Sequence, residues 1–414
     1  MSSSSMSRNR GGLVRRALLA VALALGALAV VPAIASAAAV STSGTVITFT
    51  AGGNEFNVLT VTHPATNTYL FHDASTSISE SSANCTAASG DVTCNGIAWT
   101  SVVVNLGNRD DSVTAAGVND DPFTINGEVG IDSLTGSDAN DVITGAADND
   151  TLNGGSGSDR MDGGADNDTL NGGSGIDRAL YSAATAGATV TIDNTANDLD
   201  GQGGTDNVQD SVESITGSSF NDTITGSCFA NTIVGDPGST NGSAGGNDTL
   251  NGDPASCPGG NGADILGGGE GNDIFDGDGT TGAAGFDTVT YGTPYTGAVA
   301  ATCAGQAVTA GFAVNLDTDN AADDCDGFGN TTENVHSDIE RIVGSGAADR
   351  VNAASANQGV QLLGRDGNDT LLGSPFGDFL WGEDGADTLD CAGGTDTYRT
   401  NGGDASITNC ETPV

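Results

Sequence analysis

The chain contains no lysine, and only 5% of its 414 residues are aromatic. Its 11 basic residues are all arginine and face 54 acidic side chains, which gives a formal net charge of −43. So few aromatic residues leave little material for a conventional globular core. The acidic excess disfavours nucleic acid and anionic membranes as partners. It favours cations instead, and divalent ions above all.

The sequence also lacks the common catalytic motifs. There is no GxSxG, no HExxH, no P-loop and no lysine for Schiff-base chemistry. The histidines, His63, His72 and His336, share no metal-ligand spacing and are expected to be surface or strand residues. An enzyme would have to lie within residues 38–115, which carry no nucleophile–base signature. We therefore expect no enzymatic activity.

One long hydrophobic run stands at the N-terminus. Residues 17–31 are apolar, several arginines precede them, and Pro32 and the small-residue sequence Ala35-Ser36-Ala37 follow. This pattern predicts a secretory signal peptide over residues 1–37. A twin-arginine signal at Arg15-Arg16 and a retained N-terminal anchor are the alternatives. No second segment is apolar enough to span a membrane, so we expect a secreted, extracellular protein.

Eight cysteines fit an oxidising compartment. Eight cysteines allow 105 connectivities, and pairing of sequence neighbours is the simplest hypothesis. It predicts the bridges Cys85–Cys94, Cys228–Cys257, Cys303–Cys325 and Cys391–Cys410.

The most regular feature is a series of nonapeptides without gaps over residues 127–180. The units begin at Gly127, Gly136, Gly145, Gly154, Gly163 and Gly172. Aspartate fills place six of every unit, at Asp132, Asp141, Asp150, Asp159, Asp168 and Asp177. Place eight is apolar, at Leu134, Ile143, Leu152, Met161, Leu170 and Ala179. A flexible Gly-Asp linker, the alternative, has no reason to keep an apolar residue at every eighth place.

Units beginning at Gly154, Gly259 and Gly268 match the pattern GGxGxDxUx in full. In this the chain resembles the repeats-in-toxin (RTX) family, also called hemolysin-type calcium-binding repeats. The resemblance implies an all-β fold of right-handed parallel β-roll (β-solenoid) arrays that bind multiple Ca²⁺ ions. It also implies two nonapeptides per turn, which stacks Asp132 on Asp150 and Asp159 on Asp177. The chain shows no catalytic or pore-forming domain and no C-terminal secretion signal of the kind many members carry.

The geometry of stacked strands explains the chemistry. Parallel strands lie about 4.8 Å apart, and calcium takes roughly six to eight oxygen ligands at about 2.4 Å, so carboxylates on neighbouring turns can hold one ion. Glycines at places one, two and four are expected to adopt positive φ and turn carbonyl oxygens inward. Asp148 and Asp166 tolerate the same conformation at place four, whereas Ala139 departs from it and predicts a weaker site.

Two further arrays are less regular. Place six is held by Asp222, Asp248, Asp264, Asp273 and Asp287 in the second array and by Asp349, Asp369, Asp378, Asp387 and Asp396 in the third. Asn231 replaces aspartate in one unit of the second array. With the six aspartates of the first array, these are the predicted calcium ligands.

The chain is therefore divided as follows: signal peptide 1–37, N-terminal β domain or cap 38–115, array 1 127–180, connector 181–216, array 2 217–290, connector with insertion 291–343, array 3 344–399 and C-terminal cap 400–414. The N-terminal part is expected to be β because stretches such as TVITFT and WTSVVVNL alternate apolar and polar residues. The connectors resemble each other, since Asn207, Glu213 and Ile215 align with Asn334, Glu340 and Ile342.

The turns at 198–201 and 324–327 suggest an EF-hand, but both lack its terminal glutamate, so we expect solvated turns. For the whole chain we expect a calcium-binding structural or adhesive element outside the cell, with cell-surface or matrix components as further partners. The alternative is a secreted enzyme or accessory subunit, a hydrolase or polysaccharide-modifying protein with calcium-stabilised repeats. Surface binding through the outward Thr151 and Thr169 is a third reading.

We predict that the arrays fold only when calcium is present. Aspartates about 5 Å apart repel by roughly 3 kcal/mol per pair at an effective dielectric of 20, and short strands offer little to oppose this. Calcium binding would then supply folding free energy. Circular dichroism should show little β-structure in chelator and much more in millimolar calcium; an unchanged β spectrum would contradict this.

Overall fold

The computed structural model describes residues 38–96, 98–115, 117–118, 121–237, 246–257, 262–269, 273–277, 286–291, 301–303, 306–308, 313–317, 334–336 and 338–414. The predicted signal peptide, and Cys325 of the predicted Cys303–Cys325 bridge, lie outside these residues. The described parts consist of strands and turns, and no helix in them is long and apolar enough to cross a membrane.

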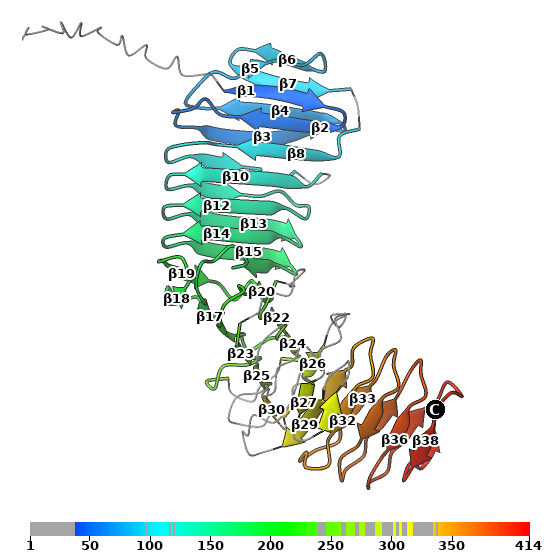
Figure 1. Cartoon of the computed structure of the whole chain (residues 1–414). Helices are drawn as coiled ribbons and strands as arrows, with labels where there is room; N and C mark the ends of the chain where they lie inside the picture. Colours follow the sequence, from blue (N-terminus) through cyan, green and yellow to red (C-terminus); the bar gives the residue numbers. More distant parts are fainter. Residues whose placement is uncertain are drawn as a thin grey trace, which may run out of the picture. The chain divides into compact units, whose positions relative to one another are not determined.

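Array 1 forms two faces of parallel strands. One face contains β10 (Phe123–Val129), β12 (Val142–Ala147), β14 (Arg160–Ala165) and β16 (Arg178–Leu180). The other contains β11 (Ser133–Thr135), β13 (Thr151–Gly157) and β15 (Thr169–Gly175). Figure 1 shows β10, β12 and β14 stacked in sequence order. The prediction of an all-β, parallel β-roll fold is confirmed.

The register repeats every 18 residues, as two nonapeptides per turn require. Leu134 pairs with Leu152, and Leu152 with Leu170. All six residues at place eight are fully buried. Because successive side chains of a strand point to opposite faces, the flanking residues point outward, and the core is a single column of apolar side chains on each face. Place eight therefore faces the interior of the array.

The N-terminal strands continue into array 1 without a break in pairing. These strands are β1 (Ala39–Ser43), β2 (Val46–Thr50), β3 (Val58–Ala65), β4 (Thr68–Asp73), β5 (Ser79–Glu80), β6 (Cys85–Ala88), β7 (Asp91–Asn95), β8 (Ser101–Asn105) and β9 (Ser112–Thr114). Antiparallel pairs β1–β2, β3–β4, β4–β7 and β6–β7 close this end. The parallel pairs β8–β10 and β9–β11 then lead into the array. The cap thus presents two ready strands on which the first nonapeptides stack.

The first connector adds one further turn of strands to array 1 and begins the next sheet. It contains β17 (Thr189–Thr191), β18 (Asp198–Leu199), β19 (Thr205–Val208) and β20 (Ser214–Thr216). Here β19 pairs with β15, and β20 pairs with β16. In the second connector β30 (Asn334–His336) pairs with β25, and β31 (Arg341–Val343) pairs with β26. The aligned connectors therefore occupy equivalent places in the fold.

Arrays 2 and 3 repeat the two faces with three-residue strands. Array 2 has β21 (Thr223–Thr225), β22 (Thr232–Val234), β23 (Thr249–Asn251), β24 (Ile265–Gly267), β25 (Ile274–Asp276) and β26 (Thr288–Thr290). Between the arrays lie β27 (Ala301–Cys303), β28 (Gln306–Val308) and β29 (Ala313–Asp317). Array 3 has β32 (Arg350–Asn352), β33 (Gln361–Leu363), β34 (Thr370–Leu372), β35 (Phe379–Trp381), β36 (Thr388–Asp390) and β37 (Thr397–Arg399), followed by β38 (Ser406–Thr408) and β39 (Thr412–Pro413). Parallel pairing joins alternate strands throughout.

Three predicted disulfides are present, Cys85–Cys94, Cys228–Cys257 and Cys391–Cys410. The first joins directly paired residues of β6 and β7. The second spans the irregular part of array 2, and the third ties the C-terminal tail to the last full unit. Each disulfide closes a loop in the unfolded chain and so reduces its conformational freedom.

Replacing Leu152 by alanine should destabilise the calcium-loaded protein. The side chain is fully buried between Leu134 and Leu170, and such truncations cost about 2–5 kcal/mol. Thr151→Ala, on the exposed side of the same strand, is the matched control and should cost less than about 0.5 kcal/mol. Thermal unfolding in saturating calcium would compare the two; equal losses would contradict the assigned core.

Candidate metal centre

The aspartates at place six form a ladder in which each carboxylate is bonded to the turn before it. The backbone N–H of Asp132 donates to Oδ1 of Asp150 at 2.7 Å, and that of Asp150 donates to Oδ1 of Asp168 at 2.8 Å. On the other face Asp141 donates to Asp159 at 2.7 Å, and Asp159 to Asp177 at 2.8 Å. All four predicted aspartate pairs are therefore neighbours.

The second carboxylate oxygen is buried and accepts no hydrogen bond from any residue in the described part of the chain. This holds for Oδ2 of Asp132, Asp150, Asp159, Asp168, Asp177, Asp248 and Asp369. Each of these side chains is at most 2% exposed. A buried carboxylate oxygen without a donor costs considerable free energy. It is the kind of ligand that a hard divalent cation prefers.

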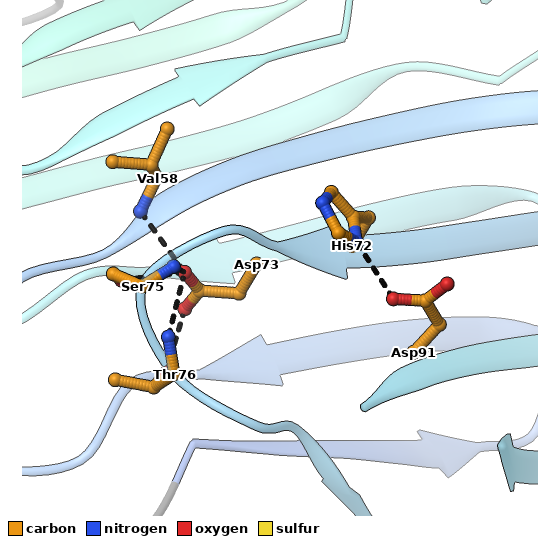
Figure 2. A network of polar contacts seen from close by, with 6 residues as sticks. All are labelled: Val58, His72, Asp73, Ser75, Thr76 and Asp91. Carbon is orange, nitrogen blue, oxygen red and sulfur yellow. Dashed lines mark hydrogen bonds and ion pairs between the residues drawn. The ribbon is translucent and has the colours of Figure 1, made fainter. Parts of the chain in front are cut away.

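Asp73 in the N-terminal part shows how this chain satisfies a buried carboxylate that needs no ion (Figure 2). Its Oδ1 accepts the N–H groups of Val58 at 3.1 Å and Ser75 at 2.9 Å, and its Oδ2 accepts the Thr76 hydroxyl at 2.9 Å and the Asn57 amide at 2.6 Å. Burial raises the pKa of Asp73, but the donors around it outweigh burial, so that its pKa lies below the usual value. The ladder carboxylates of Asp150, Asp159 and Asp168 have no such set of donors.

The ladder carboxyls have raised pKa values instead. Burial is the main cause; the donated backbone N–H lowers the pKa, and neighbouring aspartates raise it again. The pKa is raised to about 6 for Asp132, about 7 for Asp150, Asp159 and Asp369, about 8 for Asp168 and about 9 for Asp248. Without a cation, part of this ladder is therefore protonated near neutral pH.

Glycine at place one is required for space rather than for positive φ. The expectation of positive φ there is wrong, because none of the six place-one glycines of array 1 has it. A Cβ on Gly154 would instead meet Oδ2 of Asp159 and the carbonyl oxygen of Gly172. The carboxylate and the carbonyl of the next turn thus converge beside this glycine. Together they supply oxygen ligands from two successive turns.

Positive φ is found at places two and four, as expected. In the unit beginning at Gly154 these are Gly155 (φ 108°) and Gly157 (φ 118°). Asp148 (φ 74°) and Asp166 (φ 77°) adopt it at place four without glycine. Carbonyl and carboxylate oxygens around a turn of this kind fit the hard, oxygen-rich coordination of calcium. Asp150, Asp159 and Asp168, with the glycine carbonyls beside them, are the residues that would hold the ions.

The ladder extends into arrays 2 and 3. Asp222 donates its N–H to Asp248, and Asp248 to Asp273. Asp264 donates to Asp287. In array 3 Asp349 donates to Asp369, Asp369 to Asp387, and Asp378 to Asp396. All sixteen predicted ligand residues are therefore buried members of such ladders.

Sequence reasoning missed several members. Asp111 accepts the N–H of Asn57 at 2.5 Å and donates its own to Asp132 at 2.7 Å, and burial raises its pKa to about 7. Residues 106–114 form one more nine-residue unit, with Gly107 and Arg109 at positive φ and Val113 in the core. The missing glycine at place one hid this unit, although its Asp and Val stand at the correct spacing.

Glutamates close three of the ladders. Oε2 of Glu213 accepts the N–H of Asp177 at 2.9 Å, that of Glu340 accepts Asp287 at 2.7 Å, and that of Glu411 accepts Asp396 at 2.9 Å. The signal was visible in the sequence, because Glu213 and Glu340 align between the connectors. The glutamates take the place of aspartate as acceptors where the nonapeptide pattern has ended, and their longer side chains reach the N–H group of the preceding turn.

The two aspartates of the turn at 198–201 are buried, so the expectation of a solvated turn is wrong for them, although Leu199 between them is 53% exposed. Asp198 and Asp200 are each 1% exposed. Oδ1 of Asp200 accepts three backbone N–H groups, from Gln202, Gly203 and Gly204. The turn packs on the end of array 1, where Gln202 donates to the carbonyl of Gly164. The corresponding turn at 324–327 lies outside the described residues.

A separate group of possible metal ligands lies where β25 and β30 pair. One ligand atom each of Asp276, His336 and Asp338 falls within 4.8 Å of the others. Nδ1 of His336 lies 3.6 Å from Oδ2 of Asp276. The sequence could not indicate this group, because Asp276 and His336 stand 60 positions apart and come together only where Phe275 pairs with Val335.

Comparison with known families agrees with this geometry. The model of the RTX calcium-binding nonapeptide repeat matches four times, at residues 124–152, 144–179, 212–239 and 363–398. The chain thus carries RTX calcium-binding repeats, and no toxin or enzyme domain is evident. Among curated proteins, nothing matches the chain.

The calcium-free protein should become more stable as the pH falls from 8 to 5. Because the carboxyl pKa values are raised, the folded state binds more protons than the unfolded state between pH 3.8, the usual aspartate pKa, and about pH 8. The free energy of unfolding therefore increases with falling pH. Circular dichroism of metal-stripped protein should show growing β-structure over this range. Calcium-saturated protein is the control and should follow the reverse trend, because protons displace the ion. A calcium-free signal that does not change with pH would refute the assignment.

Proposed function

We propose that this protein is a secreted calcium-binding element whose arrays fold on calcium and serve a structural or adhesive role outside the cell. The observation that carries the proposal is the ladder of buried carboxylates with an oxygen left without a donor. Calcium from the surroundings would neutralise the ladder and cross-link successive turns. The protein would then be rigid where calcium is abundant and expanded where it is scarce.

An extracellular location is supported by three features. The N-terminal hydrophobic run fits a signal peptide, three disulfides are formed, and RTX repeats are typical of secreted proteins. Extracellular calcium modules bind at about 0.1–1 mM. In the cytosol, sites of that strength would stay empty.

The structural or adhesive role rests on what the side chains are used for. The ladder carboxylates are bonded to backbone N–H groups and buried, so they are not displayed to a substrate. On the outward side of β13 and β15, Thr151 and Thr169 pair directly and would contact a cell-surface or matrix component. The alternative remains an enzyme or accessory subunit whose activity lies in residues 38–115.

A calcium titration followed by small-angle scattering and calorimetry tests the proposal. The expected result is a smaller radius of gyration as several ions bind, with heat released over the same concentration range. The variant Asp159→Asn should bind fewer ions, and His72→Ala, an exposed residue bonded to Asp91, is the matched control and should bind as many as the parent. A parent chain that binds no calcium would sink the proposal.

Adhesion and enzymatic activity need their own assay. Calcium-loaded protein should sediment with envelopes of the producing cells and be released by chelator. Turnover of glycans, esters or peptides that is abolished by substitutions within residues 38–115 would favour the enzyme instead.

A further inference from the structure

The ladder contains two kinds of unit. Five units carry serine at place two and are called serine units here: 136–141, 217–222, 226–231, 344–349 and 373–378. Array 1 shows the other kind in units such as 154–159 and 163–168, which have glycine at place two; all units without serine at place two are called open units. The two kinds differ in how the residue at place six is satisfied.

In the serine units the side chain at place six accepts two hydrogen bonds from the serine of its own unit. The N–H of Ser137 donates to Oδ2 of Asp141 at 2.5 Å, and the Ser137 hydroxyl donates to Oδ1 at 2.8 Å. The units of Asp222, Asp349 and Asp378 repeat both bonds, with the serine N–H at 2.6–2.7 Å from Oδ2. None of these four carboxylates has a buried oxygen without a hydrogen-bond donor among the described residues.

The backbone of the serine units differs as well. No residue at places two and four of these five units, all of them described, has positive φ. Instead the serine hydroxyl accepts the N–H of place four, as from Ala139 at 3.1 Å and Phe376 at 3.0 Å. In the open units of arrays 1 and 3 places two and four have positive φ, as at Gly164 (103°) and Asp166 (77°). A serine unit therefore closes its turn on itself.

Asn231 provides an independent observation. It occupies place six of a serine unit, and its Oδ1 accepts both the N–H of Ser227 at 2.6 Å and the Ser227 hydroxyl at 3.2 Å. An amide replaces the carboxylate here without losing a bond to the serine. The substitution removes one negative charge, in a unit whose serine already donates two hydrogen bonds to the side-chain oxygen.

Three of the serine units also share a position, at the start of a ladder. The residues one turn before Asp141, Asp222 and Asp378 are Phe123, Ala188 and Val360, which donate their N–H groups to the carboxylate but carry none themselves. At this first rung no aspartate of an earlier turn stands on the other side of an ion. A carboxylate there requires a donor within its own unit.

We propose that serine at place two makes these five units metal-free rungs of the ladders, so that calcium enters the open units only. This rests on the proposed calcium-binding function and divides its ligands. Asp141, Asp222, Asp349 and Asp378 are structural acceptors, and the remaining place-six aspartates bind the ions. The unit with Ala139, expected from its sequence to be a weaker site, is then not a site.

The test counts calcium bound to the purified protein by equilibrium dialysis and metal analysis. Asp141→Asn should bind the same number of ions as the parent, because asparagine keeps the acceptor that Asn231 uses. Asp159→Asn, one turn further on the same face, should bind at least one ion fewer. Equal losses in the two variants would overturn the division, and circular dichroism in saturating calcium establishes that both are folded.

A gain-of-charge variant keeps the inference testable if an aspartate variant fails to fold. Asn231→Asp restores the carboxylate in a serine unit and should add no ion, because Ser227 occupies it. One additional calcium in this variant would overturn the inference while leaving the proposed function intact. A parent protein that binds no calcium would overturn both.

Discussion

The structure depends on a hydrogen bond from the backbone N–H of one aspartate to the carboxylate of the aspartate one turn later. It fixes the carboxylates of successive turns at the spacing of parallel strands, where like charges repel. The same bond leaves the second oxygen of carboxylates such as those of Asp150, Asp159 and Asp168 buried with no hydrogen-bond donor among the described residues. Stability of the arrays is therefore coupled to whatever neutralises that oxygen, a proton or a calcium ion.

The apolar core is too narrow to offset this by itself. Each turn buries one apolar side chain per face, and three-residue strands add few ladder hydrogen bonds. The chain reinforces the places where the nonapeptide pattern fails. The antiparallel cap begins the stack, Glu213 and Glu340 complete the last rungs of their arrays, and disulfides fasten the irregular part of array 2 and the C-terminal tail.

Much of the fold could be predicted because it follows from the repeat pattern. An apolar residue at place eight and an aspartate at place six, repeated every nine residues, indicate a repetitive β-structure, and the resemblance to RTX repeats adds the 18-residue register and the aspartate pairs. The reason for glycine at place one could not be obtained that way, because it depends on the carbonyl of Gly172 one turn later. Asp111 was not predicted because Leu106 rather than glycine stands at place one of its unit. The burial of Asp200 was not predicted because its hydrogen-bond donors are backbone N–H groups of the residues that follow it.

Every carboxylate of the ladder bonds back to an amide that precedes it in the chain, never to one that follows. A chain made from its N-terminus therefore exposes each amide before the carboxylate that will cap it exists. The antiparallel cap can form first, and the strands of each new turn can then pair with the exposed edge of the turn that is already folded. The arrays carry a direction of growth that coincides with the order in which their residues emerge from the ribosome or an export channel.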